Sequence, residues 1–134
     1  MSGGNSRVVA CVIQRGDRML VCRRPVTKRH GGLWEFPGGK AEPSESDADA
    51  AARELLEELR VRLVRAAPTA FEIADPDSSY IIAFIPVEIE GEPVSTEHSG
   101  MQWGHPNDLA SLPLAPSDRA FVDWLLSREA AVND

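Results

Sequence analysis

Three glutamates, Glu54, Glu57 and Glu58, occupy positions i, i+3 and i+4 of one segment of the chain. On a helix each residue advances about 100°, so the three carboxylates would fall within one arc of the surface. Like charges at these spacings repel by roughly 0.2–0.5 kcal/mol per pair, and a bound hard cation would remove that repulsion. Since Mg²⁺ prefers oxygen ligands and shares substrate phosphates, the pattern predicts a divalent-metal site. A solvated acidic face is the alternative.

The helix that would carry these glutamates is expected to begin after Ser46, a residue type that caps helices, and to end near Leu59. Its apolar side is expected to comprise Ala48, Ala52, Leu55, Leu56 and Leu59. The pair Gly38-Gly39 comes before the helix and predicts a turn. A glycine turn followed by an acidic helix indicates a phosphate site beside the metal site.

The same segment resembles the Nudix hydrolase box. That pattern reads Gly, five residues, Glu, seven residues, Arg-Glu, an aliphatic residue, any residue, Glu-Glu, any residue, Gly and an aliphatic residue. The chain matches it in register at Gly39, Glu45, Arg53, Glu54, Leu55, Glu57, Glu58 and Val61. Arg60 stands where the family has the second Gly, which leaves the helix with positive φ, and a non-Gly residue there costs about 1 kcal/mol.

The resemblance implies a role for each residue of this region. The metal ligands would be the Gly38 carbonyl and the carboxylates of Glu54, Glu57, Glu58 and Glu97. Either Glu54 or Glu97 would take the proton of the attacking water, and Arg53 would orient the box glutamates. The implied metal is Mg²⁺, with Mn²⁺ as the alternative.

Residues 23–25 and 32–40 resemble the MutT-type nucleoside triphosphate pyrophosphohydrolases. Glu97-His98, Trp103 and residues 113–118 are similar to their CTP pyrophosphohydrolase branch. This resemblance implies hydrolysis of a (deoxy)nucleoside triphosphate to a nucleoside monophosphate and pyrophosphate, with Arg24 and Lys40 facing the phosphates. Hydrolysis of ADP-ribose or another nucleoside diphosphate sugar is the alternative activity. A module that binds nucleotides without catalysis is the alternative from outside the enzymes.

Asp118 falls where the MutT pattern has an Asn that reads the base. An ionised carboxylate only accepts hydrogen bonds, so Asp118 is expected to favour bases with amino donors, namely cytosine, guanine or oxidised guanine. A helix-capping role is the alternative for Asp118. Phe36 and Trp34 are expected to stack on the base, with a core position as the alternative for each.

The chain of 134 residues is expected to form a single domain over residues 1–134, with residues 1–6 disordered. Its formal net charge of −7 argues against binding nucleic-acid polymers, whose phosphates demand a basic face. The sequence shows neither a membrane-length apolar run nor a signal peptide. These observations predict a cytoplasmic monomer or homodimer that takes a small nucleotide substrate and has no membrane partner.

Runs rich in β-branched residues predict strands at 7–14, 18–24, 62–71, 80–90 and 101–103, and the remaining pattern predicts helices at 106–110 and 116–131. A turn at Gly16-Asp17 would join the first two strands and set Cys11 opposite Cys22, both as reduced core residues. Mixed strands with one box helix and a closing helix predict an α+β fold. The resemblance implies, more specifically, the α/β/α sandwich of the Nudix fold.

Overall fold

The structure is a computed structural model that describes residues 6–133. The expectation of disorder at residues 1–5 lies outside this range, whereas the Ser6 carbonyl accepts a hydrogen bond from Ile81 N–H at 2.9 Å. Across the described range, no helix is long and apolar enough to cross a membrane.

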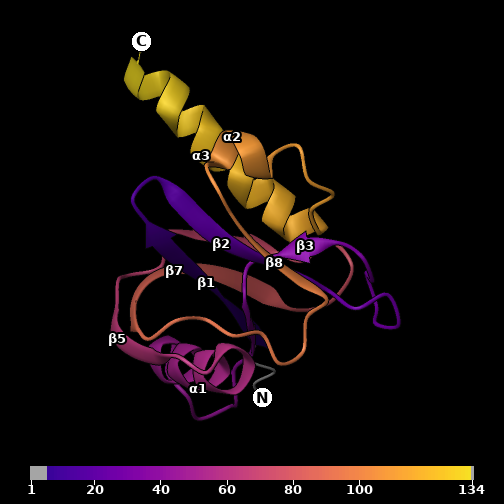
Figure 1. Ribbon diagram of the computed structural model, residues 1–134, viewed down its shortest axis with the longest axis vertical. Helices are drawn as coiled ribbons and strands as arrows, with labels where there is room; N and C mark the ends of the chain where they lie inside the picture. Colours follow the sequence, from indigo (N-terminus) through magenta and orange to yellow (C-terminus); the bar gives the residue numbers. More distant parts are fainter. Residues whose placement is uncertain (1–5, 134) are drawn as a thin grey trace.

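Figure 1 shows three layers, in which α1 covers one face of a mixed sheet while α2 and α3 cover the other. The helices are α1 (Asp47–Leu59), α2 (Pro106–Leu109) and α3 (Pro116–Asn133). The strands within residues 6–133 are β1 (Arg7–Arg15), β2 (Arg18–Arg23), β3 (Trp34–Glu35), β4 (Gly38–Lys40), β5 (Arg62–Ala66), β6 (Phe71–Ala74), β7 (Ile81–Glu90) and β8 (Gly100–Gly104). The predicted α+β class and α/β/α sandwich are therefore confirmed.

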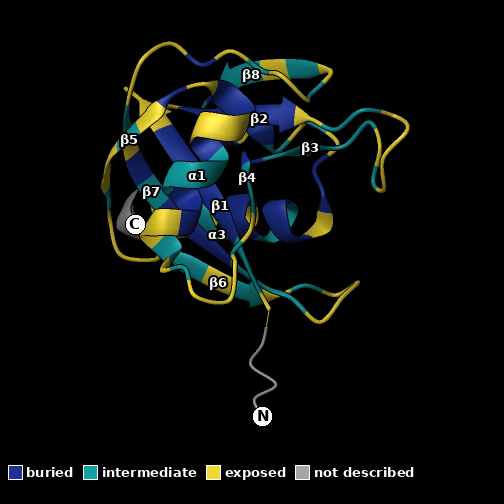
Figure 2. Ribbon diagram, turned by 90° about the horizontal axis from the view of Figure 1, so that it is seen from below, coloured by how far each residue is buried: buried dark blue, intermediate teal, exposed yellow. Residues whose placement is uncertain are grey.

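The parallel pair β1 and β7 forms the centre of the sheet, which runs in the order β3-β2-β1-β7-β5. Strand β4 pairs with β1, β6 with β7, and β8 with β2. Figure 2 shows that β1 and β7 are largely buried, as expected for strands covered on both faces. One core packs against α1, and a second core, rich in phenylalanine, packs against α3.

The β1–β2 hairpin forms at Gly16-Asp17 as predicted, but its ladder contains only the pairs Gln14↔Met19 and Arg15↔Arg18. Beyond them β1 pairs with β4, and β2 pairs with β3 and β8. Cys11 N–H consequently donates to the Pro37 carbonyl at 2.7 Å, so the predicted pairing of Cys11 with Cys22 is wrong. Both cysteines are free and buried.

The strand predicted over residues 62–71 is also wrong as a single element, because β5 ends at Ala66 and β6 begins at Phe71. Pro68 lies in the break and has no N–H for a ladder hydrogen bond. The flanking residues bond to β7 instead, since Ala67 N–H donates to the Pro86 carbonyl and Ala70 N–H to the Phe84 carbonyl. Two short strands therefore border β7 where one long strand was expected.

Helix α1 begins after Ser46, whose hydroxyl accepts the Asp49 N–H at 3.1 Å, and it ends at Leu59 as predicted. Its buried face was predicted incorrectly, because Ala48 is exposed and Leu56 is 60% exposed. The buried residues of the helix are Ala50, Ala51, Leu55, Glu58 and Leu59. The acidic face therefore overlaps the buried face, and one of its carboxylates enters the protein interior.

Candidate active site

The close approach of α1 to β4 requires the two glycines of the turn. A Cβ at Gly39 would lie 2.5 Å from the carboxylate carbon of Glu54, so only glycine leaves room for that side chain. Gly38 has φ of +149°, and a Cβ there would lie 1.9 Å from the Val9 carbonyl oxygen. Gly38 N–H also donates to Glu58 Oε1 at 3.4 Å. The Gly-Gly sequence thus brings β4 against the acidic face of α1.

Glu54 and Glu58 form a crowded carboxylate pair on that face. Glu58 is only 9% exposed, and burial, followed by its hydrogen bond to Glu54, raises its pKa to about 9. The charges of Glu54 and Glu97 act in the same direction. Near neutral pH the Glu54–Glu58 pair therefore shares a proton, and that proton reduces the repulsion that was inferred from the sequence.

Arg53 is the cation that holds this acidic cluster. Its guanidinium makes two hydrogen bonds to Glu45, at 2.8 and 2.9 Å, and it contacts Glu54 at 3.0 Å and Glu57 at 3.4 Å. It also donates to the Lys40 carbonyl at 2.9 Å. The hydrogen bond from Arg53 lowers the pKa of Glu45 to about 2. Arg53 therefore links α1 to β4 and to the loop between them.

The donor set fits a hard divalent cation, because it consists of oxygen atoms. A small cavity of about 120 Å³ is lined by Gly38, Glu58 and Glu97, among others, and Glu54 lies beside it through its bond to Glu58. The Glu57 side chain is 57% exposed and contacts Arg53 at 3.4 Å. Among the residues that the structure describes, no three acidic, His or Cys side chains already converge on one point. The carboxylates would thus have to rotate to bind an ion.

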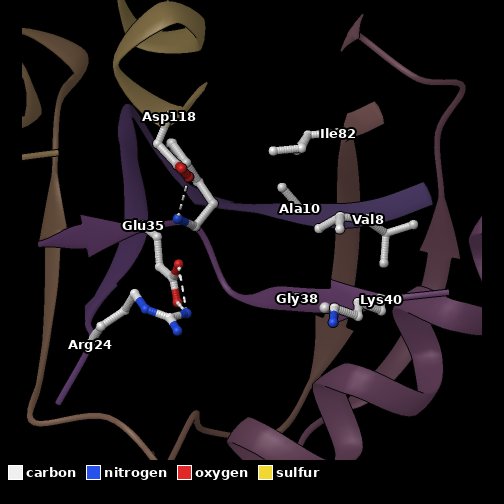
Figure 3. Close-up of a pocket in the computed structure, with 11 residues that line it drawn as sticks. Val8, Ala10, Arg24, Glu35, Gly38, Lys40, Ile82 and Asp118 are labelled. Atoms are coloured by element: carbon white, nitrogen blue, oxygen red, sulfur yellow. Dashed lines mark hydrogen bonds and ion pairs between the residues drawn. The ribbon is translucent and has the colours of Figure 1, made fainter. Parts of the chain in front are cut away.

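A larger cavity of about 250 Å³ lies next to this cluster (Figure 3). Its apolar wall is formed by Val8 and Ala10 of β1 and Ile82 of β7, and Val8 pairs with Ile82 in the parallel ladder. Its polar residues are Arg24, Glu35, Lys40 and Asp118. The apolar residues and Glu35 were not predicted from the sequence. The alternation of residues 8 and 10 on one face of β1 was the only available signal for the wall.

The two predicted phosphate-binding residues both line this larger cavity. Arg24 Nη1 contacts the Glu35 carboxylate at 3.2 and 3.3 Å, and its Nε donates to the Arg29 carbonyl at 2.7 Å. The Lys40 ammonium lies 5.0 Å from the centre of the Tyr80 ring. Cationic groups therefore stand on both sides of the cavity that adjoins the carboxylate cluster.

Asp118 lines the same cavity (Figure 3) and is 7% exposed. Its Oδ2 accepts the Phe36 N–H at 2.9 Å, so the side chain ties α3 to the segment between β3 and β4. Burial raises the pKa of Asp118 to about 8. The sequence argument assumed an ionised Asp118, whereas this raised pKa favours the neutral acid near pH 7, which can donate as well as accept hydrogen bonds.

Neither predicted stacking residue lies open to the larger cavity. Phe36 borders the cavity but is only 3% exposed, and its ring packs edge-on against Phe84 and Phe121. Trp34 lies instead beside Arg23, whose guanidinium is 5.8 Å from the ring centre. Phe36 therefore occupies a core position, which was the alternative to base stacking.

Comparison with known proteins identifies the family. The model of the NUDIX domain matches residues 4–125. The CTP pyrophosphohydrolase of Escherichia coli (strain K12) is 32% identical, over 92% of this chain and 93% of that protein. The 8-oxo-dGTP diphosphatase of Proteus vulgaris is 38% identical over a shorter stretch, 37% of this chain and 45% of that protein.

Solved structures give the same answer. A structure of MutT, from work on Aliivibrio salmonicida and Vibrio cholerae, superposes with a TM-score of 0.79 at 27% identity, over 92% of this chain and 98% of that one. Nudix hydrolases generally use divalent metal ions and act on small nucleotides. The fold, the acidic helix behind a glycine turn and these similarities establish that the chain belongs to the Nudix hydrolase family.

Proposed function

We propose that this chain hydrolyses (deoxy)nucleoside triphosphates to a nucleoside monophosphate and pyrophosphate, with cytosine or oxidised guanine nucleotides as the preferred substrates. One observation carries the proposal: the larger cavity and the small acidic cavity share Arg24, Glu35 and Gly38 as lining residues. A nucleotide whose base lies in the larger cavity would therefore extend its phosphates toward the carboxylate cluster.

The apolar wall of Val8, Ala10 and Ile82 would cover one face of the base, and Asp118 would meet its polar edge. Arg24 and Lys40 would contact the phosphates. Phe36 would hold Asp118 in place through its backbone N–H rather than stack on the base. Trp34 would contribute to base binding from the edge of the cavity. The activities named for two relatives support the preference for cytosine or oxidised guanine, and Asp118 would strengthen this preference when it is ionised.

The residues fit a divalent metal, Mg²⁺ or Mn²⁺, held by the Gly38 carbonyl and by Glu54, Glu57, Glu58 and Glu97. A bound ion would neutralise non-bridging phosphate oxygens. Arg53 would hold Glu54 and Glu57 in place, as its contacts at 3.0 and 3.4 Å suggest. Either Glu54 or Glu97 would accept the water proton.

In the proposed reaction the water oxygen forms a bond to the β phosphorus. The bond from the β phosphorus to the oxygen that bridges it to the α phosphorus breaks, and the nucleoside monophosphate leaves with that oxygen. The water proton passes to the carboxylate base. We infer that one domain over residues 1–134 acts in the cytoplasm, as a monomer or homodimer and without a nucleic-acid polymer or membrane partner.

A nucleotide panel assayed with Mg²⁺ tests the proposal. It should contain CTP, dCTP, 8-oxo-dGTP, UTP, dTTP and ADP-ribose, with separate detection of pyrophosphate and orthophosphate. We expect pyrophosphate release, fastest from a cytosine or oxidised guanine nucleotide. Faster turnover of ADP-ribose than of every triphosphate would favour the nucleoside diphosphate sugar activity. Binding without turnover of any member would indicate a non-catalytic module.

A further inference from the structure

His98 lies between a carboxylate of the nucleotide cavity and a carboxylate of the box. Its side chain is 7% exposed, and its Nε2 is 3.7 Å from Glu35 Oε2 and 4.0 Å from Glu58 Oε1. Both distances are slightly too long for direct hydrogen bonds, but Nε2 faces both carboxylates, and a small rotation of either carboxylate would close a bond to it. The ring also forms part of the wall of the small acidic cavity.

The neighbouring Ser95 contacts the other nitrogen of the ring. Ser95 Oγ accepts the His98 backbone N–H at 3.0 Å and stands 3.3 Å from His98 Nδ1. In the tautomer with the proton on Nε2, Nδ1 is an acceptor and the Ser95 hydroxyl donates to it. That tautomer also presents an N–H to Glu35 and Glu58, the two carboxylates that Nε2 faces.

The loop that carries His98, residues 91–99 between β7 and β8, is fastened at both ends. Val94 N–H donates to the Leu59 carbonyl at 2.9 Å and Thr96 N–H to the Glu58 carbonyl at 3.1 Å, which satisfies free carbonyls at the end of α1. Ser99 N–H donates to the Arg23 carbonyl of β2 at 2.9 Å. The imidazole is therefore held relative to both the box helix and the strand that leads to Arg24.

We propose that His98 is a positioning residue. Through its Nε2–H it holds Glu58, on the metal side, and Glu35, on the nucleotide side, in a fixed position relative to each other. A continuous series of contacts, from Arg24 to Glu35, His98 and Glu58, joins a phosphate-side cation to a metal ligand. The inference rests on the proposed function for its catalytic meaning. The geometry of the series is independent of the substrate.

Metal affinity of the substrate-free protein tests the role of His98. Mn²⁺ binding, followed by electron paramagnetic resonance, should weaken about 10–100-fold in His98→Ala, the size of effect typical for residues that orient metal ligands. His98→Gln retains an N–H donor and should recover part of the affinity. His105→Asn is the matched control, because it replaces a histidine that caps α2 with another capping residue, and it should bind Mn²⁺ as the wild type does.

Kinetics and spectroscopy supply two further measurements. With the best nucleotide, His98→Ala should lower kcat more than it changes KM, and His98→Gln should lie between it and the wild type. In metal-free protein near pH 8, ¹⁵N resonances should show the Nε2–H tautomer of His98, and Ser95→Ala should mix the tautomers.

Wild-type Mn²⁺ affinity in both His98 variants, or an Nδ1–H tautomer in the wild type, would overturn the assignment. These two measurements need no substrate. An absence of triphosphate hydrolysis in the wild type would therefore reject the proposed function and leave the test of His98 intact.

Discussion

The Glu54 carboxylate occupies the space that a side chain at Gly39 would need, with 2.5 Å between its Cδ and the Cβ of a residue built there. The first glycine of the box and its first helical glutamate thus form one packing unit. This contact, more than turn formation, explains why position 39 must lack a side chain. Gly38, at φ of +149°, is required for a different reason, because its backbone conformation and the nearby Val9 carbonyl both exclude a Cβ.

Gly39→Ala should therefore disable the site while the fold survives. The added methyl group would push the Glu54 carboxylate away by about 1 Å, a displacement that lowers catalytic efficiency by about 100-fold. Steady-state kinetics with the best nucleotide would measure the loss.

Gly16→Ala is a suitable control, since a Cβ at Gly16 meets nothing within 4 Å and the hairpin turn is remote from the site. It should lower stability, because φ is +61° there, and leave kcat/KM unchanged. Equal kcat/KM in the two variants would refute this account of position 39.

Arg60 is a strained residue at the end of α1. It has φ of +59°, and its N–H donates to the Leu56 carbonyl at 3.2 Å. Arg60→Gly should relieve about 1 kcal/mol of backbone strain, partly offset by the greater freedom of glycine in the unfolded chain. We expect a slightly higher Tm and nearly unchanged turnover. Arg60→Ala, which removes the side chain but keeps the strain, should show no such gain. A lower Tm for Arg60→Gly than for Arg60→Ala would mean that the strain is absent.

The sequence predicted the elements that depend on local signals. Ser46 caps α1 and Gly16-Asp17 forms the turn of the first hairpin, both as expected. Arg60, which replaces the second glycine of the box, has the left-handed conformation that the family pattern implied. The first two outcomes follow from a residue's own conformational preference or from a side chain that bonds within three residues. Arg60 takes its conformation against its own preference, because the end of α1 requires it. The box pattern likewise located the acidic helix, which the structure sets against β4.

The errors arose where distant segments decide the result. Cys11 lost its expected partner because β4 pairs with β1 beyond the turn, a contact that no local pattern contains. Phe36 is a core residue because Phe84 and Phe121 surround it. Burial changed the expected protonation of Asp118, and Glu35 was missed because its partners, Arg24 and His98, come from two other loops.

Asp118 should make base selectivity depend on pH. The neutral acid both donates and accepts, whereas the ionised form only accepts and so favours amino-bearing bases. The ratio of kcat/KM for CTP to that for UTP should therefore rise as pH passes through about 8, the pKa of Asp118. Asp118→Asn should bring the ratio of kcat/KM for CTP to that for UTP closer to one and make this ratio independent of pH. Asp118→Ala should lower kcat/KM for the best nucleotide by about 1–3 kcal/mol. Equal losses for every base in both variants would assign selectivity elsewhere.

The same carboxyl should also make stability depend on pH. Burial raises the pKa of Asp118 from 3.8 to about 8, so between these values the folded state binds more protons than the unfolded state. The contribution of Asp118 to the free energy of unfolding should fall as pH rises across this window and then stay constant. Urea denaturation of wild type and Asp118→Asn at several pH values would isolate it, since the amide keeps an acceptor for Phe36 N–H. A difference between the two proteins that does not grow with pH would contradict the raised pKa.

Hydrolysis of one good nucleotide in ¹⁸O-labelled water tests the central claim most directly. The account predicts equal amounts of nucleoside monophosphate and pyrophosphate, with one ¹⁸O atom in the pyrophosphate. Glu57→Gln and Glu58→Gln should lose this activity by orders of magnitude without losing stability, because Glu57 is an exposed carboxylate and Glu58 belongs to a carboxylate pair that already shares a proton. Asp123→Asn, an exposed change on α3, should behave as the wild type. Release of nucleoside diphosphate and labelled orthophosphate, or normal turnover by Glu57→Gln and Glu58→Gln, would contradict the account.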